Sequence, residues 1–481
     1  MRTRSCPGQA ATLQRCGAEP GPISSSNSLP PGPRLCSAPL KERCAASGAR
    51  ERRSPPLKSL LQCTILGTMA SSEITLEAVP SIGEVAPEDW DACANPGKAC
   101  NGNGTGTSSA LPGDSAGLLK SAYNPFVSHA FLSAAEKSGS ANIRTGWGPR
   151  HLVAKLDGRV AGVVPCYLKS HSQGEYVFDR GWADAYERAG GRYYPKLQVS
   201  VPFTPATGPR LLVRDGVDRG RITEALASGL VALCGVSKAS SVHVTFAREA
   251  EWKLLARHGF LQRTDQQFHW HNDGFASFDD FLATLNSRHR KSIKRERRDA
   301  LAAGITIHWL RGKDITEDAW DAFFEFYMET GSRKWGRPYL TREFFSLISE
   351  TMSEDVLLVM ARRNNRWIAG AINFIGSDTL FGRNWGAVEH HPFLHFEVCY
   401  YQAIDFAIKH GLRHVEAGAQ GEHKIARGYL PKTTYSAHFI ADPGLRRAID
   451  DYLKRERAYV AEAGRELAEL GPFRKGADEA P

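Results

Sequence analysis

The chain has 481 residues, of which 42% are hydrophobic and 10% aromatic, so it is long enough to bury the cores of two or more domains. Its formal charge of +9 is concentrated in residues 1–72, which hold ten Lys/Arg and three Asp/Glu and therefore carry +7. The remaining +2 does not support a body that binds DNA by bulk positive charge. No apolar run approaches the roughly 20 residues of a membrane-spanning helix.

Residues 1–72 are rich in Arg, Ser, Pro, Gly and Ala and show neither a helix nor a strand period, which predicts a disordered leader. This composition is typical of an organellar transit peptide. A plastid or mitochondrial location is then expected. Alternatively, Met69 starts a shorter cytoplasmic form, or the leader is an untranslated or merely disordered extension.

Ten cysteines are present, seven of them in the first 100 residues. Cys166, Cys234 and Cys399 lie far apart in apolar stretches, which predicts core thiols rather than disulfides or metal ligands. The sequence contains no CxxC or HExxH motif, so no metal site is predicted.

A first domain is predicted at residues 73–262, with a Gly/Asn/Ser-rich surface loop at 93–119. The patterns predict a helix at 128–137 and a hairpin of strands 152–156 and 160–168 around Asp157-Gly158. Helix and strand patterns then alternate, which indicates mixed α/β layers. Helices are expected at 222–234 and 250–258, and strands at 241–246 and 266–271.

A second domain is predicted at residues 263–445, and it repeats the hairpin. Its strands at 357–361 and 367–375 flank a turn, and a GRNW sequence at 382–385 matches DRGW at 179–182 of the first domain. These matches favour an internal duplication, although two similar hairpins can also arise by chance. A C-terminal helix and tail are expected at 446–481.

The densest positive charge of the second domain falls on a helix predicted at 285–303. Positions 290, 294, 297 and 298 are spaced by one turn or less, so they share one face. Such a face can bind a phosphate or carboxylate of a substrate. A solvated helix face would give the same pattern.

Another group of polar residues begins at Arg383 and Trp385, two candidate substrate-binding residues in the GRNW sequence. Glu397 and Tyr400 lie three residues apart at the start of a helix expected at 398–410. This spacing places a carboxylate beside a phenol, a pair that can serve as acid or base.

A loop interrupted by glycines follows the strand that we expect to end near Glu416. Loops at strand ends often carry chemistry, so Glu416 or His423 is predicted as a general base. Gln420 and Lys424, together with Arg383, are predicted to hold anionic or carbonyl groups. An ordinary polar loop, whose glycines serve the turn, is the alternative. The sequence has no GxSxG, Walker or GxGxxG motif, which argues against the familiar hydrolase and nucleotide-binding classes.

Four segments resemble one family, the FemAB-like proteins, which are related to peptidoglycan-bridge aminoacyl transferases and to GNAT acetyltransferases. They are VPFTP at 201–205, QFHW at 267–270, the basic helix after FDDF at 278–281, and EAGAQGEHK at 416–424. The resemblance covers roughly residues 124–442. It implies an α/β (α+β) fold of two tandem GNAT-like domains, with mixed sheets flanked by helices.

The resemblance also implies roles for single residues. In relatives, a basic helical segment and a late lysine hold a phosphate-bearing acceptor, roles that match Arg290, Lys291 and Lys294, and Lys424. The expected co-substrate is an acyl donor, either an acyl-CoA or an aminoacyl-tRNA, and no tightly bound cofactor is expected. The chain lacks the R/Q-x-x-G-x-G/A loop that binds the pyrophosphate of acyl-CoA.

The sequence therefore predicts an acyl or aminoacyl transferase that acts on an amine or hydroxyl of a small-molecule or peptide acceptor. Glu416 or His423 would act as the base, aided by Glu397 with Tyr400. A non-catalytic module that recognises a peptidoglycan-like or amino-sugar peptide is the alternative, and an interaction scaffold is a third possibility.

Overall fold

The computed structural model describes residues 73–97, 123–335, 338–419 and 421–474. The predicted leader at 1–72 and most of the predicted loop at 93–119 lie outside the described residues. The first residues of that loop are part of the core instead, because Cys93 and Asn95 are only 3% and 2% exposed. The Asn95 side chain donates to the carbonyl of Asn124 (3.2 Å) and accepts from its amide (2.9 Å), so it joins the two sides of the insertion.

The first half of the chain runs from β1 to β9. Its strands are β1 (Ile74–Val79), β2 (Trp147–Pro149), β3 (His151–Leu156), β4 (Arg159–Val164), β5 (Cys166–Lys169), β6 (Lys196–Val199), β7 (Leu212–Val213), β8 (Ser241–Ala247) and β9 (Leu261–His271). Its helices are α1 (Pro87–Ala94), α2 (His129–Lys137), α3 (Arg180–Arg188), α4 (Arg219–Val236) and α5 (Glu249–Arg257).

The local predictions for this half are confirmed except for the lengths of two strands. The strand predicted at 266–271 begins earlier, at Leu261, and the second hairpin strand ends earlier than predicted. Helix α2 begins where the sequence predicts, because Ser128 caps it by accepting from the amide of Phe131. Asp157 and Gly158 both have positive φ, as the tight turn between β3 and β4 requires. The second strand of the hairpin is shorter than predicted, because Pro165 has no N–H to donate and separates β4 from β5.

The second half runs from α6 to α12. Its strands are β10 (Thr306–Leu310), β11 (Val356–Arg363), β12 (Arg366–Ile375), β13 (Thr379–Ala387), β14 (His414–Glu416) and β15 (Leu430–Ile440). Its helices are α6 (Phe278–Thr284), α7 (Ser287–Leu301), α8 (Glu317–Trp335), α9 (Arg342–Met352), α10 (Leu394–Phe396), a π-helix (Glu397–Tyr401), α11 (Gln402–Lys409) and α12 (Pro443–Glu469).

The second hairpin is confirmed as well, with Asn364 and Asn365 at positive φ between β11 and β12. The helix expected at 398–410 is a π-helix for its first turn and α-helical only from Gln402. The match between DRGW and GRNW was wrong, since Trp182 lies in helix α3 whereas Trp385 lies in strand β13.

The duplication is visible in the sheet topology instead. In each half a two-stranded hairpin (β3–β4 or β11–β12) leads to a pair of parallel strands, β6 with β8 and β13 with β14. The last strands are then exchanged. Strand β9 of the first half pairs with β14, and β15 of the second half pairs with β8. The fold is thus a pair of tandem GNAT-like α/β halves.

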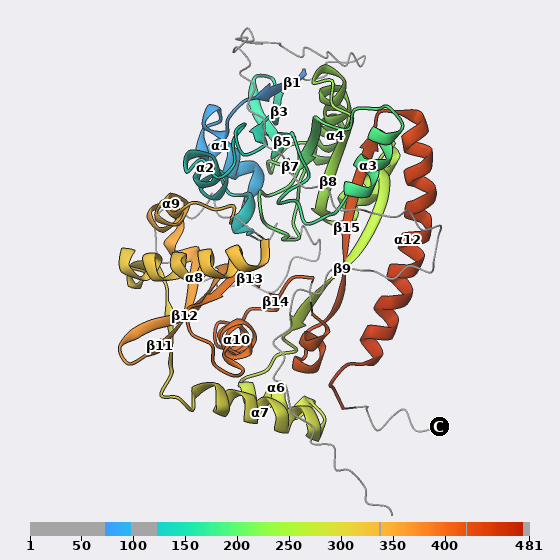
Figure 1. The fold of residues 1–481 in the computed structure, drawn as a ribbon. Coiled ribbons are helices and arrows are strands. Elements are labelled where there is room, and N and C mark those ends of the chain that lie inside the picture. The colour runs from blue at the N-terminus through green and yellow to red at the C-terminus, as the bar shows by residue number, and fades with distance from the viewer. Residues whose placement is uncertain (1–72, 98–122, 336–337, 420, 475–481) are drawn as a thin grey trace, which may run out of the picture. The chain divides into compact units, whose positions relative to one another are not determined.

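This exchange joins the halves into one 11-stranded sheet, ordered β10-β11-β12-β13-β14-β9-β15-β8-β6-β5-β2, beside a four-stranded sheet ordered β1-β3-β4-β7. Strands β9 and β15 run side by side along their length (Figure 1). The predicted domain boundary at 262/263 falls inside β9, and the boundary at 445/446 falls inside α12. The division of the chain into domains at these two positions stays a prediction.

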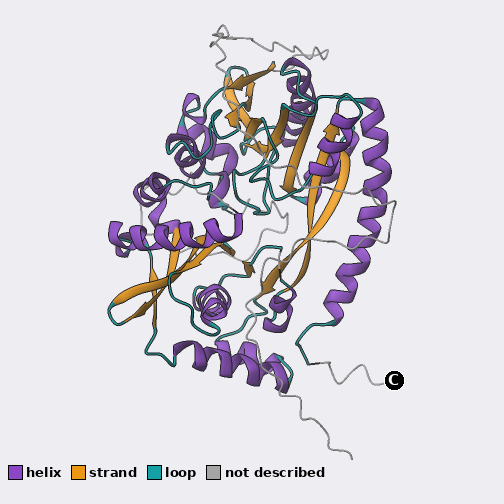
Figure 2. Cartoon of the chain, viewed as in Figure 1, coloured by secondary structure: helices purple, strands orange, loops and turns teal. Residues whose placement is uncertain are grey.

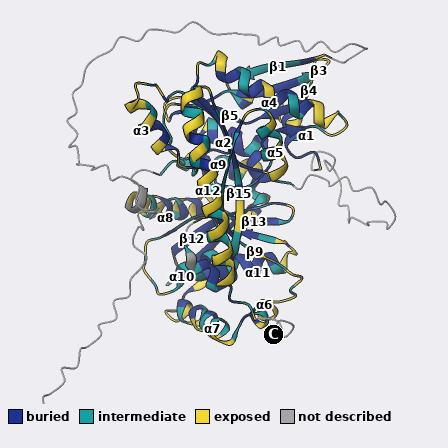
Figure 3. Ribbon diagram, turned by 90° about the vertical axis from the view of Figure 1, so that its right-hand side faces the viewer, coloured by how far each residue is buried: buried dark blue, intermediate teal, exposed yellow. Residues whose placement is uncertain are grey.

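Helices cover the sheets (Figure 2), and one hydrophobic core cluster contains residues of both halves. Helix α12 packs along β9 and β15, and its outer side is exposed, as is that of α7 (Figure 3). Phe126 of the first half packs against Phe374 and Phe381 of the second, with ring centroids 4.9 and 5.2 Å apart. The halves therefore share a hydrophobic core, which favours a fixed arrangement between them.

Two predictions about absences can be compared only with the described residues. Within them, no helix is long and apolar enough to cross a membrane, and no group of acidic, His and Cys side chains has the geometry of a metal site. Cys166 and Cys234 are buried free thiols, as predicted, and Cys399 is partly buried.

Candidate functional site

The candidate site lies where two parallel strands of the second half separate. β13 and β14 pair from Thr379/His414 to Phe381/Glu416, and there β14 ends at a loop whose Gly418 has positive φ. Strand β13 continues, with a bulge in which Arg383 and Asn384 together oppose Ile372 of β12. Arg383 and Glu416 consequently lie at the opening between the two strands.

Glu416 is a buried carboxylate at this opening, with 5% of its surface exposed. Burial raises its pKa to about 7, although Arg383 and the backbone amide of Thr207 oppose the shift. Its Oε1 is 4.0 Å from Nε2 of His269, its partner in the register between β14 and β9. Its Oε2 has no hydrogen-bond partner among the described residues. A carboxyl with this pKa can both accept and release a proton near neutral pH.

Arg383 contributes a buried guanidinium on the same side of the sheet. The guanidinium lies 4.9 Å from the ring centroid of Phe126, and its Nη1 donates to the carbonyl of Gly382 (3.2 Å). Burial lowers its pKa to about 10, with Glu416 opposing, so it remains charged at neutral pH. Both Nε and Nη2 lack a partner within the described part of the chain.

His269 and Gln267 of β9 line the same face, although the sequence predicted no functional role for either residue. Nε2 of His269 lies 3.3 Å from Oε1 of Gln267, whose amide donates to the carbonyl of Pro205 (2.7 Å). Burial lowers the pKa of His269 to about 3, so the ring is neutral. The signal was their alternation in the QFHW sequence, where Gln267 and His269 face one side and Phe268 and Trp270 the other.

Two other predicted loop residues, His423 and Lys424, lie on the opposite face of this sheet. Lys424 is 4% exposed, and its Nζ lies 5.7 Å from the ring of Phe268 and donates to the carbonyl of Gly418 (3.2 Å). Burial lowers the pKa of Lys424 to about 8. Nε2 of His423 lies 3.1 Å from the hydroxyl of Tyr400, and burial lowers the pKa of this histidine to about 4. The structure therefore divides the predicted site in two.

Glu397 is not available to a substrate in this structure, because it is fully buried and bonded. Arg297 of α7 donates to both of its oxygens, with Nε–Oε2 and Nη2–Oε1 distances of 3.1 and 3.0 Å. The side-chain amide of Gln402 also donates to Oε1 (2.7 Å). The pair joins α7 to the π-helix. The geometry therefore favours a structural role for Glu397 over the predicted catalytic one.

Of the remaining predicted residues, those that the structure describes have contacts with other groups or with solvent. On α7, Lys291 is exposed, Lys294 pairs with Asp279 (2.9 Å), and Arg290 lies 3.4 Å from the hydroxyl of Ser287. The ring of Trp385 packs 5.2 Å from that of His395. Gln420 lies outside the described residues.

Two hollows on the surface of the described chain are lined by residues other than the predicted site residues. One of about 470 Å³ is lined by Glu77, Asp89 and Arg214 among others, and one of about 430 Å³ by Glu325 and Met328 among others.

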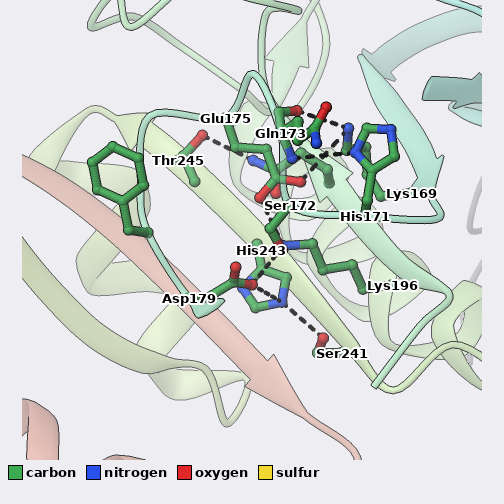
Figure 4. Close-up of polar contacts among 12 residues, drawn as sticks. Lys169, His171, Ser172, Gln173, Glu175, Asp179, Lys196, Ser241, His243 and Thr245 are labelled. Carbon is green, nitrogen blue, oxygen red and sulfur yellow. Dashed lines mark hydrogen bonds and ion pairs between the residues drawn. The ribbon is translucent and has the colours of Figure 1, made fainter. Parts of the chain in front are cut away.

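A cluster of buried charges in the first half was also missed (Figure 4). Nζ of Lys196 lies 2.7 Å from Glu175 and 2.5 Å from Asp179, and Lys169 lies 3.7 Å from the ring centroid of Trp147. Burial lowers the pKa of Lys169 to about 7 and raises that of Glu175 to about 6. The sequence signal was a lysine at one end of each of two short, mostly apolar strands, CYLK in β5 and KLQV in β6. Because its two lysines and two carboxylates balance in charge, the cluster fits a structural role.

The strand order and the site define the class of the protein as a tandem GNAT-like α/β fold. The family model of the FemAB-like proteins, described as peptidoglycan biosynthesis/recognition, matches residues 81–475. The chain belongs to the FemAB-like family. No significant match to a curated protein sequence was found.

Comparison with solved structures finds distant similarities, at low identity and low TM-score. FemX is 14% identical, with 66% of this chain and 93% of that chain covered and a TM-score of 0.43. A tandem GNAT protein from the clavulanic acid biosynthesis pathway is 14% identical, with 77% and 99% covered and a TM-score of 0.37. L-PGS from Bacillus licheniformis is 8% identical, with 61% and 86% covered and a TM-score of 0.39. These likenesses are too weak to assign a function, and the fold assignment depends on the sheet topology.

Proposed function

We propose that this protein is an acyl or aminoacyl transferase that moves an activated acyl group to an amine or hydroxyl acceptor, with Glu416 as the general base. The observation that supports it is a carboxyl group buried where two strands separate, with an unpartnered oxygen and a pKa near 7. A base is most effective when its pKa is close to the working pH. His423 is a weaker candidate, because its pKa is about 4 and Tyr400 already engages its ring.

The reaction with an amine acceptor follows from this arrangement. Glu416 takes one proton from the ammonium group, and the free amine attacks the acyl carbon. The C–N bond forms as the C–S or C–O bond to the leaving group breaks, and the second proton of the nitrogen passes to the departing thiolate or alkoxide. Glu416 then releases its proton to solvent. Arg383 would hold an anionic or carbonyl group at the same opening.

The proposed donor is an acyl-CoA or an aminoacyl-tRNA, used as a co-substrate. The family description makes a peptidoglycan-related peptide the first acceptor to test. Exposed Lys291 and its neighbours on α7 are the candidates for contacts with phosphate groups of these substrates.

The test is product formation by the full-length protein with labelled acyl-CoAs and aminoacyl-tRNAs against a panel of amine acceptors. We expect Glu416→Gln to lower turnover by about 100-fold or more, the usual contribution of a general base. The control is Glu350→Gln at an exposed position of α9, which should leave turnover unchanged. Unchanged turnover in Glu416→Gln would exclude this base. Binding without product from any donor would instead indicate a recognition module.

A further inference from the structure

Arg383 differs from two other partly buried arginines, Arg297 and Arg263, in how its guanidinium edge is used. Arg297 and Arg263 each present Nε and Nη2 to the two oxygens of one carboxylate, Glu397 and Glu456, at distances between 2.7 and 3.1 Å. Nη2 of Arg297 also donates to Asp405 (2.6 Å). The same edge of Arg383 is buried and has no partner among the described residues. This edge carries two parallel N–H groups whose spacing matches the two oxygens of a carboxylate.

Glu416, the carboxylate that acts on the pKa of Arg383, does not form a hydrogen-bonded ion pair with this edge. No nitrogen of Arg383 comes within 4.0 Å of a Glu416 oxygen, although the two groups attract each other across the opening. Glu416 Oε2 is itself buried without a donor. Leaving buried donors and acceptors unpaired costs free energy at each of them, so the pair is complementary to a ligand that supplies what both lack.

The missing partners define the chemistry of that ligand. Arg383 requires two acceptor oxygens held in one plane, and Glu416 requires a cationic N–H donor beside them. A phosphate group satisfies only the first requirement, and it would bring further negative charge against Glu416. An ammonium and a carboxylate carried on one carbon satisfy both.

We propose that the acceptor presents an amino-carboxylate group, with its carboxylate on the Nε/Nη2 edge of Arg383 and its ammonium on Oε2 of Glu416. The inference depends on the proposed function, because it places the acceptor nitrogen on the base that deprotonates it. Acylation there gives an N-acyl amino acid. The ring of Phe126 behind the guanidinium excludes water from the ion pair and so strengthens it. Two sources share this chemistry: a free amino acid, or a peptide side chain that ends in an amino-carboxylate, as in diaminopimelic acid.

The test is calorimetric binding to the full-length protein at pH 8 without any donor. Alanine is compared with ethylamine, which lacks the carboxylate, and with N-acetylalanine, which lacks the ammonium. A muropeptide that contains diaminopimelate is compared with one that contains lysine, whose side chain ends in an amine alone. We expect alanine or the diaminopimelate peptide to bind at least about 30-fold more tightly than its matched controls, the effect of removing one partner of a buried charged pair.

The variant Arg383→Lys keeps the charge and removes the two parallel donors, so it should lose the same factor, whereas Arg188→Lys at an exposed position of α3 should lose nothing. The comparison of ligands on the unmodified protein does not depend on the folding of any variant. Equal binding by the matched ligands, no binding by any of them, or inorganic phosphate binding better than amino-carboxylates would overturn the proposal. The binding test contains no donor, so its result is independent of the turnover assay. If amino-carboxylates bind but no donor gives product, only the transferase proposal is rejected. If amines without a carboxylate are acylated in the turnover assay, only the proposed acceptor is rejected.

Discussion

Replacing Glu416 with Gln should stabilise the folded protein at alkaline pH while removing its activity. Burial raises the pKa of this carboxyl from 4.5 to about 7, so ionising it is harder in the folded state than in the unfolded chain. At about 1.4 kcal/mol for each pH unit, the ionised folded state is destabilised by about 3 kcal/mol. Glutamine has nearly the same shape and carries no charge, so the variant should not lose that stability.

The sign of the effect fixes its pH window. Below pH 4.5 the carboxyl is protonated in both states, and the two proteins should unfold with similar free energies. Between pH 4.5 and about 7 the unfolded chain ionises first, which lowers the stability of the unmodified protein as the pH rises. Above pH 7 the difference should be constant at about 3 kcal/mol in favour of Glu416→Gln.

The assay is equilibrium unfolding in urea at pH 4.5 and pH 8, followed by tryptophan fluorescence. The exchange of β9 and β15 between the halves predicts a single transition, which allows one free energy of unfolding to be compared. Glu350→Gln, at an exposed position, should change the free energy little at either pH. A Glu416→Gln protein that is less stable than the unmodified one at pH 8, or a difference that is equal at both pH values, would refute the reasoning.

Three further predictions follow from the buried charges. With an amine acceptor, kcat/KM should rise about tenfold per pH unit up to about pH 7 and then level off, and this bend should be absent from the residual activity of Glu416→Gln. Lys196→Met should cost about 3–5 kcal/mol in urea unfolding, because two buried carboxylates lose their partner, whereas Lys253→Met at an exposed pair should change little. Arg297→Met should cost about 3 kcal/mol by the same measurement, since it leaves a buried carboxylate unpaired, and a loss no larger than that of Arg298→Met would contradict this role.

The sequence predicted local structure well where a few neighbouring residues decide it. Asp157-Gly158 and Asn364-Asn365 adopt positive φ at low cost, so both hairpins could be predicted from their turns. The serine that caps α2 was readable for the same reason. The π-helical turn at Glu397–Tyr401 was not, because it inserts one residue into a helical pattern without a distinct local signal.

The candidate site was predicted only in part. Glu416 and Arg383 were both nominated, but each was grouped with its neighbours in the sequence. Successive side chains of β9 point to opposite faces, and Glu416 pairs with His269 whereas Lys424 lies against the ring of Phe268, so the two residues are on different sides of the β9–β14 pair. His269 was passed over because a histidine in a strand pattern is more often structural.

The sequence by itself determined the turns, the helix starts and the family resemblance, because short segments carry those signals. Only the tertiary structure decided that the last strands are exchanged between the halves. It also decided that Arg383 and Glu416 face one opening, and that Glu397 forms a buried ion pair with Arg297. Those outcomes depend on pairings between residues far apart in the chain. The pairings are selected by the packing of the whole core, and no local pattern encodes them.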